Sequence, residues 1–270
     1  MINIRKVKSV DELYDHINQI HEVSSAYVTN FYAGKDSLQS WIEWKEADYL
    51  LTEKALFLLR NSKFSTQVYY FSDGNEEVLT GLKQLTEERD SLNVDYLGHG
   101  DDMKEVYEAA GFKYYIALSR MTRFCKEGED GRLEYGEYAK SDDAEEICDI
   151  LEKSMDIMAD QVPSVYEIKE YINQSRAIIL RNKDNNDIIS CILWTRLGKG
   201  MEWKYWALNP NYKGTIYSIN LLDDYLRING AVKRATLFVR DGNPASTIYQ
   251  KIGFKYDGLK DYVYCFRRDR

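Results

Sequence analysis

The chain has 270 residues, of which 44% are hydrophobic and 30% are charged, and its formal net charge is −8. This hydrophobic content excludes an intrinsically disordered protein, and the length is enough for two cores of ordinary domain size. The segment before Gly131 carries 15 basic and 23 acidic residues, whereas the remainder carries 21 of each. An acidic first half disfavours nucleic acids and anionic membranes as partners, and the neutral second half is the better host for an anionic ligand.

The sequence shows no pattern typical of a disulfide, a metal site or a membrane span. The four cysteines show neither close pairing nor metal-ligand spacing, and the three histidines are scattered. We therefore expect reduced thiols, no disulfide and no metal site. Residues 1–7 alternate like a strand, and no apolar run reaches the length of a membrane span. The sequence thus predicts a soluble, cytoplasmic protein without a membrane segment.

The first half of the chain mixes strand patterns with one-sided helical patterns. Ser9 or Asp11 begins the first helix, and Gly74 precedes another whose first turn is acidic. The polar segment 125–131 has no apolar period, so it is the predicted linker between domains 1–124 and 132–270. The predicted strands lie at 2–8, 55–60, 66–72 and 93–97, and the predicted helices lie at 10–24, 36–46 and from 75 to about 90.

The second half opens with a helix start at Ser141, which is followed by acidic residues in the first turn. Pro163 and Ser164 interrupt the helical pattern before a second, shorter helix. Three strands separated by polar turns then form an antiparallel meander. The predicted helices lie at 141–158, 165–174 and 218–229, and the predicted strands lie at 176–182, 188–197, 200–208 and 235–239.

One segment of 14 residues occurs twice. Asp101–Tyr114 and Asn243–Tyr256 align at a constant offset of 142 residues, with Tyr, Gly-Phe-Lys and Tyr in register. Each copy predicts a short helix, a glycine with positive φ that ends it, and a strand that a core phenylalanine opens. A repeat at this distance indicates two copies of one domain.

Asn243, Ala245, Tyr249, Gly253 and Phe254 resemble the last conserved motif of the GCN5-related N-acetyltransferase (GNAT) superfamily. The resemblance covers nearly the whole second half, and the first half has the same ending after a shorter element order. It implies an α/β (α+β) fold with two GNAT-like domains, each a mixed, mostly antiparallel twisted sheet flanked by helices. By the same resemblance, the second domain is a catalytic domain that binds acetyl-CoA (coenzyme A), with two strands at its end, and the first is a diverged, non-catalytic copy.

The stretch from Trp206 to Ser218 resembles the pyrophosphate loop of that family, in which backbone N–H groups and a helix N-terminus surround phosphate oxygens. Ile216 stands where the family has a glycine, and its branched side chain opposes the close approach of a pyrophosphate. Asn243 either bridges the loop to the cofactor or caps the following helix. The resemblance implies cofactor binding by Leu208, Lys213, Gly214, Thr215, Ile216, Tyr217, Ser218 and Asn243.

Two catalytic side chains follow from the resemblance. Tyr249 occupies the place of the tyrosine that protonates the departing thiolate, although a packing role fits the same position. Glu202 is the candidate general base, and an exposed ion pair with Lys204 is the alternative. Simple alternation places Glu202, Lys204 and Trp206 on one face of their strand, and Trp203 with Tyr205 on the other.

The first copy lacks a recognisable phosphate loop, and Glu76 and Glu77 place negative charge at the helix start where a pyrophosphate would lie. The predicted function is transfer of an acetyl group from acetyl-CoA to a primary amine of a small molecule or peptide, by a monomer or homodimer. One alternative is a non-catalytic binding or scaffold protein that has lost coenzyme A. Another is transfer from an aminoacyl-tRNA, which the acidic composition opposes.

Overall fold

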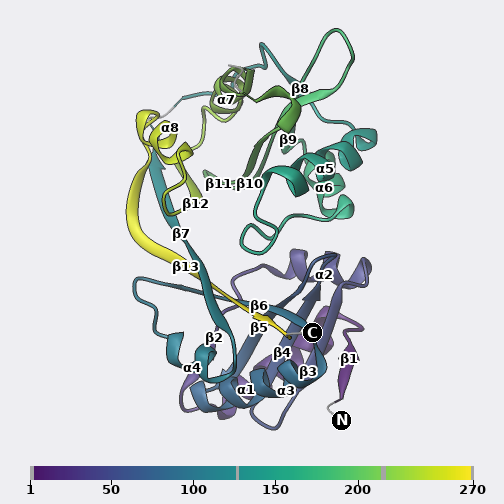
Figure 1. Cartoon of the computed structure of the whole chain (residues 1–270), viewed down its shortest axis with the longest axis vertical. Coiled ribbons are helices and arrows are strands. Elements are labelled where there is room, and N and C mark those ends of the chain that lie inside the picture. The colour runs from purple at the N-terminus through teal and green to yellow at the C-terminus, as the bar shows by residue number, and fades with distance from the viewer. Residues whose placement is uncertain (1–2, 126–127, 214–216, 269–270) are drawn as a thin grey trace. The chain divides into compact units, whose positions relative to one another are not determined.

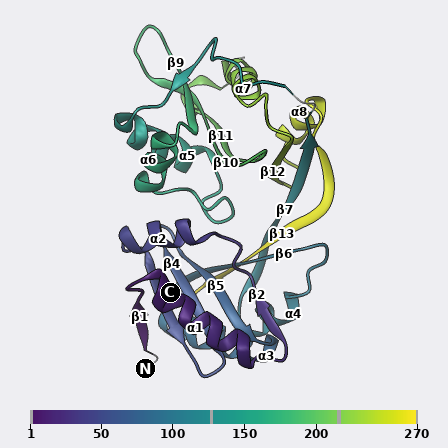
Figure 2. The ribbon, with the colours of Figure 1, turned by 180° about the vertical axis from the view of Figure 1, so that it is seen from behind.

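The computed structural model describes residues 3–125, 128–213 and 217–268. Two compact units are formed, one by the residues up to Leu118 together with those from Leu259 onward, and the other by Ser119–Gly258 (Figures 1 and 2). Two long strands, β7 (Lys113–Phe124) and β13 (Lys255–Arg267), each contribute one part to either unit.

The first unit is a mixed sheet with the strand order β1-β3-β4-β5-β6-β13, and β2 pairs with β5 outside this order. Only the β5–β6 pair is parallel among these strand pairs; the others are antiparallel. The strands are β1 (Ile4–Lys6), β2 (Tyr27–Thr29), β3 (Ala47–Leu51), β4 (Ala55–Asn61), β5 (Thr66–Asp73) and β6 (Ser91–Gly98), and the helices are α1 (Val10–Val23), α2 (Lys35–Glu43), α3 (Asn75–Glu88) and α4 (Lys104–Ala109).

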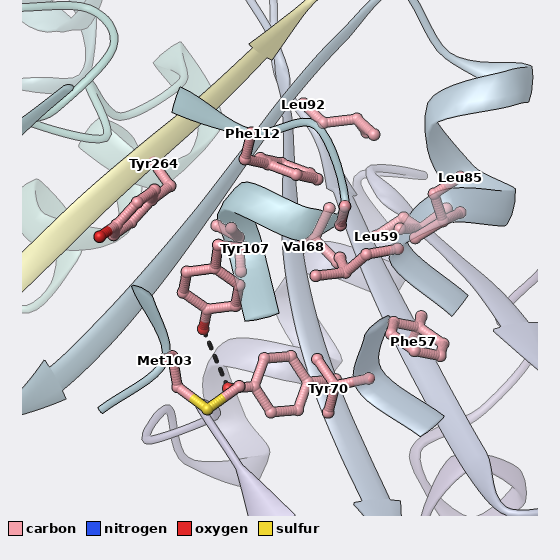
Figure 3. Close-up of a cluster of buried hydrophobic side chains, with 14 of the residues drawn as sticks. Phe57, Leu59, Val68, Tyr70, Leu85, Leu92, Met103, Tyr107, Phe112 and Tyr264 are labelled. Atoms are coloured by element: carbon pink, nitrogen blue, oxygen red, sulfur yellow. Dashed lines mark hydrogen bonds between the residues drawn. The ribbon is translucent and has the colours of Figure 1, made fainter. Parts of the chain in front are cut away.

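Helices cover both faces of this sheet. Leu13 of α1 and Trp41 of α2 pack on the face that carries Leu58, whereas α3 and α4 pack on the face that carries Phe57. Figure 3 shows the second of these cores, in which Tyr107 of α4 lies among side chains of the sheet.

The second unit has the strand order β8-β9-β10-β11-β12-β7. Strands β8 to β11 pair antiparallel, which confirms the predicted meander, and β11 pairs with β12 in parallel. Helices α5 and α6 cover one face of the sheet and α7 covers the other (Figure 1). The strands are β8 (Glu137–Tyr138), β9 (Ala177–Arg181), β10 (Ile188–Leu197), β11 (Gly200–Leu208) and β12 (Arg234–Arg240); the helices are α5 (Ala144–Ser154), α6 (Val165–Asn173), α7 (Tyr217–Ile228) and α8 (Ala245–Lys251), with short 3₁₀ turns at Ser141–Asp143 and Pro210–Tyr212.

The duplicated segment has the predicted conformation in both units. Gly111 and Gly253 follow the short helices α4 and α8 with φ of 90° and 96°, a region that favours glycine. Phe112 and Phe254 are buried directly after them. The predicted fold class, with mixed and mostly antiparallel sheets flanked by helices, is therefore confirmed.

The end of the chain differs from the expected arrangement. Two terminal strands are expected in the second domain, but β13 is one continuous strand, and its residues from Lys260 to Arg267 pair with β6 of the first unit. Tyr264 is fully buried in the core of that unit, so this part of β13 is held there by apolar packing. The units thus divide the chain differently from a linear boundary at 124 and 132. Strands β2 and β3 are also absent from the predicted elements.

Candidate active site

Strands β11 and β12 of the second unit lie side by side at their beginning and then separate. Their parallel pairing runs from Gly200 opposite Arg234 to Trp203 opposite Leu237, and β11 continues for five more residues. The separation coincides with a β-bulge. Trp203 pairs with Trp194 of β10, whereas Tyr205 pairs with Leu193, so Lys204 is an extra residue in β11. A bulge bends its strand and raises its local twist, which turns the end of β11 away from β12.

The bulge also corrects the predicted side-chain alternation. Trp203 and Trp206 pack against the same core, beneath α7, and their ring centroids are 5.5 Å apart. Tyr205 instead joins the core beneath α5 and α6. The prediction that Trp203 and Tyr205 share a face is wrong because the inserted Lys204 reverses the alternation that follows it.

The separated part of β11 presents backbone groups to the open side. The Asn209 N–H donates to the Ile189 carbonyl of β10 at 2.8 Å, and Ala207 lies opposite Cys191. Because successive backbone groups of a strand point in opposite directions, the N–H groups of Trp206 and Leu208 point away from β10. Among the described residues, no strand pairs with them on that side. The opening can therefore accept an extended ligand that carries amide groups.

An aromatic cluster borders this opening. Tyr249 of α8 meets Trp203 edge to face with ring centroids 5.2 Å apart, and its centroid is 6.0 Å from that of Trp206. The Trp206 indole Nε1 is buried without a hydrogen-bond partner in the part of the chain that the structure describes. A buried donor of this kind carries a free-energy penalty unless an acceptor meets it. The indole N–H is therefore a candidate ligand contact.

The hydroxyl of Tyr249 is available for proton transfer. Within residues 3–125, 128–213 and 217–268, no hydrogen bond to this hydroxyl is found, and the side chain is half-buried. Burial is the larger cause that raises the Tyr249 pKa above that of an ordinary tyrosine, and the nearby negative charge of Asp160 raises it further. Tyr249 therefore stays protonated at neutral pH.

Glu202, the predicted base, lies where β11 and β12 are still paired, opposite Thr236. Its Oε1 is 2.7 Å from Lys204 Nζ, and both side chains are about one third exposed. This ion pair with Lys204 is the alternative to a catalytic role that the sequence indicates for Glu202. The structure brings Glu202 together with Lys204, and no hydrogen bond or ion pair joins it to Tyr249 among the described residues. Its catalytic role stays a prediction.

The predicted cofactor-binding residues are only partly within the structure. Leu208 ends β11, Lys213 is exposed after the 3₁₀ turn, and Tyr217 and Ser218 begin α7. Gly214, Thr215 and Ile216 lie outside the described residues. Asn243 lies just before α8, and its Oδ1 accepts the N–H of Ala245, the first residue of the helix, at 2.9 Å. Its contact with a cofactor stays a prediction.

Strands β5 and β6 of the first unit separate in the same manner, but protein fills the space between them. They pair in parallel only from Thr66 opposite Leu92 to Val68 opposite Val94. Strand β2 then pairs with β5 from Phe71 to Asp73, and β4 already occupies the other edge of β5. Strand β2 must therefore lie on the edge of β5 that β6 has left.

Asn30, which directly follows β2, joins the separating strands. Its Nδ2 donates to the Val68 carbonyl of β5 at 3.1 Å and to the Asp95 carbonyl of β6 at 3.0 Å. Its Oδ1 accepts the Tyr70 N–H at 2.8 Å. The residue is 4% exposed. The Asn30 carboxamide thus supplies the donor and the acceptor that an amide of a bound ligand would offer.

Tyr107, which aligns with Tyr249 in the repeat, is also engaged within its unit. Its hydroxyl lies 2.9 Å from that of Tyr70 (Figure 3). The same hydroxyl donates to the Asp95 carbonyl at 3.3 Å. The ring is completely buried, and burial is the main reason that its pKa is raised. Tyr107 is therefore a core residue with no open side.

No protein-family model matches the chain, and no curated protein matches its sequence. Solved structures match its fold. A GCN5-related N-acetyltransferase from Sphaerobacter thermophilus shares 12% identity at a TM-score of 0.60, and the match covers 98% of this chain and 95% of that one. A tandem GNAT protein from the clavulanic acid biosynthesis pathway shares 8% identity at a TM-score of 0.62, with 100% and 99% covered. A GCN5-related N-acetyltransferase from Kribbella flavida shares 11% at 0.55, with 86% and 93% covered. The chain has a tandem GNAT fold.

The second GNAT unit contains acidic residues near its opening that sequence analysis missed. Asp156 and Asp160 lie in the loop between α5 and α6, where the sequence shows only a break in the helical pattern. Arg240, at the end of β12, approaches Asp156 with its Nη1 3.3 Å from Oδ2. The spacing of Asp156 and Asp160, four residues apart, is the only local signal for this site in the sequence. The burial of Asp160 depends on the tertiary fold and cannot be predicted from that spacing.

Two further findings concern other kinds of site in this tandem GNAT fold. Within the described ranges, no group of three or more His, Cys, Asp or Glu side chains is placed to hold a metal ion. No helix in that part of the chain is both long and apolar enough to cross a membrane. A surface hollow, which contains none of the residues of the opening, is lined by Glu146, Asp149, Ile150, Lys153, Asp187, Asn209, Pro210 and Asn211.

Proposed function

We propose that the second unit is an N-acyltransferase that transfers an acetyl group from acetyl-CoA to a primary amine of a small molecule or peptide. The observation that carries this proposal is the opening between β11 and β12, where backbone N–H groups and a buried indole N–H lack partners among the described residues. The opening fits an extended chain of amides such as the pantetheine arm of coenzyme A. The solved structures with this fold include proteins named as N-acetyltransferases, which supports the same reaction class.

Each residue near the opening has a role in this proposal. The N–H groups of Trp206 and Leu208 and the Trp206 indole hold the pantetheine amides and orient the thioester. Lys213 and the start of α7 lie at the end of β11 where the pyrophosphate would bind. The Tyr249 hydroxyl donates its proton to the departing thiolate, a role that its place beside the opening and its lack of a hydrogen-bond partner among the described residues support.

We also propose that the first unit is not catalytic. Strand β2 and Asn30 occupy the space that a pantetheine arm would need, and the Tyr107 hydroxyl is engaged by Tyr70 and Asp95. Glu76 and Glu77 in the first turn of α3 add negative charge at the helix start. A cytoplasmic location and a monomeric or homodimeric state are parts of the same proposal.

The test is calorimetric titration of the full chain with acetyl-CoA. Leu208→Pro removes the backbone N–H that faces the opening, and this N–H does not bond to β10, so the sheet should tolerate the change. Leu208→Ala is the matched control, since it shortens the side chain but keeps the N–H. We expect micromolar binding by the wild-type protein and by Leu208→Ala, and clear weakening in Leu208→Pro. Absence of binding at millimolar acetyl-CoA would reject the enzyme and favour a non-catalytic binding or scaffold protein.

A further inference from the structure

The loop between α5 and α6 is fastened to both of the strands that separate. The Tyr205 hydroxyl of β11 donates to the Gln161 carbonyl at 2.8 Å. At the other side, Arg240 of β12 contacts Asp156 with its Nη1 3.3 Å from Oδ2. Ser154, at the end of α5, donates its hydroxyl to the Leu208 carbonyl at 3.1 Å. The loop is thus anchored to strand residues at the opening itself.

Asp160 is held in this loop by backbone bonds. Its Oδ2 accepts the Asp156 N–H at 2.7 Å, and its own N–H donates to the Asp156 carbonyl at 2.8 Å. The next residue, Gln161, has a φ of 44°, a left-handed conformation that residues other than glycine rarely adopt. Strained backbone of this kind persists only where the surrounding structure holds it, here through the bond of the Gln161 carbonyl to the Tyr205 hydroxyl.

The charges around Asp160 leave its carboxylate without a cation of its own. Asp156 takes the ion pair with Arg240, and no salt bridge or hydrogen bond to Asp160 Oδ1 is found among the residues the structure describes. The loop that carries Asp160 is bonded to β11 and β12, and the Tyr249 ring contacts Trp203 and Trp206 of β11. Within the described ranges, Asp160 Oδ1 and the Tyr249 hydroxyl, both on segments that border the opening, thus have no hydrogen-bond partner.

We infer that Asp160, rather than Glu202, is the general base that receives the proton of the acceptor ammonium group. This inference rests on the proposed acetyl transfer. Asp160 and Tyr249 then form an acid–base pair near the same opening, in which one side chain removes a proton from the nucleophile and the other supplies a proton to the leaving group. Glu202 is engaged by Lys204 in the paired part of the strands.

The proton balance of this step is complete. An acceptor R–NH3+ gives one proton to the Asp160 carboxylate and becomes R–NH2. The nitrogen lone pair forms the C–N bond with the thioester carbonyl carbon, and the C–S bond breaks. The thiolate takes the Tyr249 proton, and the phenolate recovers a proton from the nitrogen, which leaves a neutral amide. Asp160 finally releases its proton to solvent.

Burial and charge around Asp160 support this role. Burial is the largest influence on the Asp160 pKa and raises it above the ordinary carboxyl value, and Asp156 also raises it. The Asp156 N–H and Arg240 act in the opposite direction. A carboxylate with a raised pKa is a stronger base, and an amine that arrives as a cation offsets the cost of the buried charge.

The kinetic test compares Asp160→Asn with Glu202→Gln, two isosteric changes that each remove one candidate base. Release of thiol from acetyl-CoA is followed with spermidine, 2-phenylethylamine and a lysine-containing tripeptide as acceptors, and with water alone if none of them is acetylated. We expect Asp160→Asn to lower kcat about a hundredfold, with a kcat that no longer rises with pH, whereas Glu202→Gln changes kcat less than about threefold. The affinity for acetyl-CoA, measured by calorimetry, should match the wild type in both variants.

A second measurement distinguishes a base from a structural residue. Because the folded-state pKa of Asp160 is raised, its ionisation destabilises the fold as the pH rises through that pKa, and the protonated form is favoured below it. Asp160→Asn should therefore raise the melting temperature at pH 8, and the difference should shrink as the pH falls. A melting temperature lowered at every pH would overturn the inference and indicate a structural hydrogen bond.

The possible failures are separable. If the wild-type protein does not bind acetyl-CoA, or binds it without turnover with any acceptor or with water, the proposed function fails and the inference fails with it. If the wild type turns over and Asp160→Asn keeps its kcat within about threefold, only the assignment of Asp160 is wrong. A hundredfold loss in Glu202→Gln alone would transfer the role of base to Glu202.

Discussion

A corresponding pair of parallel strands separates in each unit, but only the first unit fills the space between the strands with its own described residues. In the first unit, β5 and β6 separate after Val68, and Asn30 bonds to both strands. In the second unit, β11 and β12 separate after Trp203, and the indole of Trp206 remains without a partner among the described residues. Separated strands leave backbone polar groups that need a hydrogen-bond partner. One unit supplies it from its own chain, and we propose that the other takes it from a cofactor.

The repeat tyrosines follow the same division. Tyr107 is fully buried and bonded to Tyr70, whereas Tyr249 is half-buried and no hydrogen bond to its hydroxyl is found in the described part of the chain. Identical residues at matching positions therefore have a structural use in one unit and a chemical use, by our proposal, in the other. Retention of the tyrosine in both copies does not by itself indicate catalysis in both.

The largest effect is expected from removing the Asn30 carboxamide, which joins β5 and β6 where they separate. Asn30→Ala removes the hydrogen bonds of the carboxamide to the Val68 and Asp95 carbonyls and to the Tyr70 N–H. A buried hydrogen bond contributes about 1 kcal/mol, so we expect the loss of three to lower the free energy of unfolding by about 3 kcal/mol. Urea denaturation followed by fluorescence measures it.

The control for this prediction is Asn18→Ala, which changes an exposed asparagine on α1 of the same unit. That variant should unfold within about 0.5 kcal/mol of the wild type. If Asn30→Ala were equally harmless, the Asn30 carboxamide would not be what holds β5 and β6 together where they separate.

The sequence predicts the fold well where a local pattern repeats. The paired Tyr, Gly and Phe of the two segments predict Gly111 and Gly253 with positive φ and the buried Phe112 and Phe254, and the structure confirms these features. The antiparallel meander of the second unit is likewise visible from its strands and polar turns.

Other features depend on contacts that a local pattern cannot show. Strand β2 has three residues, too few for an alternation, and it exists because β5 offers a free edge. The placement of β13 in the first unit depends on the burial of Tyr264 in a core that other segments build. The extra residue Lys204 is recognisable only when β10 is placed opposite β11.

The candidate site is predictable only in part for the same reason. Tyr249 is found from its place in a repeated motif, and the structure places its ring against Trp203 and Trp206 beside the opening, while its catalytic role stays a prediction. Asp160 carries no sequence signal of this kind, since its burial depends on how the loop between α5 and α6 folds onto β11 and β12.

Replacing Tyr249 and Tyr107 separately should have different effects on catalysis and on stability. Tyr249→Phe should keep acetyl-CoA binding and lower kcat about a hundredfold, equivalent to about 2.7 kcal/mol in the activation barrier. Tyr107→Phe should leave kcat unchanged and lower the unfolding free energy by about 1 kcal/mol, because a buried hydroxyl pair is broken. Steady-state kinetics and denaturation on both variants test this. Equal kcat in the wild type and Tyr249→Phe would exclude Tyr249 as the acid.

A smaller effect is expected from the indole. Trp206→Phe removes a buried N–H that lacks a partner in the described structure, so the stability of the free protein should change little. Its affinity for acetyl-CoA should fall about fivefold, the equivalent of one ordinary hydrogen bond of about 1 kcal/mol. Trp203→Phe is the contrasting variant, because the Trp203 indole donates to the Tyr205 carbonyl at 3.3 Å within the unit. That change should lower stability more than affinity, and the reverse pattern would reject the assignment of the indole as a ligand contact.

The smallest effect is expected from the ion pair at the bulge. Glu202 and Lys204 are each about one third exposed and lie 2.7 Å apart, and exposed pairs contribute at most about 1 kcal/mol. Lys204→Ala should therefore change the free energy of unfolding by less than about 0.5 kcal/mol at physiological salt. If Glu202 were instead the base, removal of the cation beside it would also change kcat by more than about threefold. An unchanged kcat in Lys204→Ala would contradict a role of the bulge pair in removing the proton.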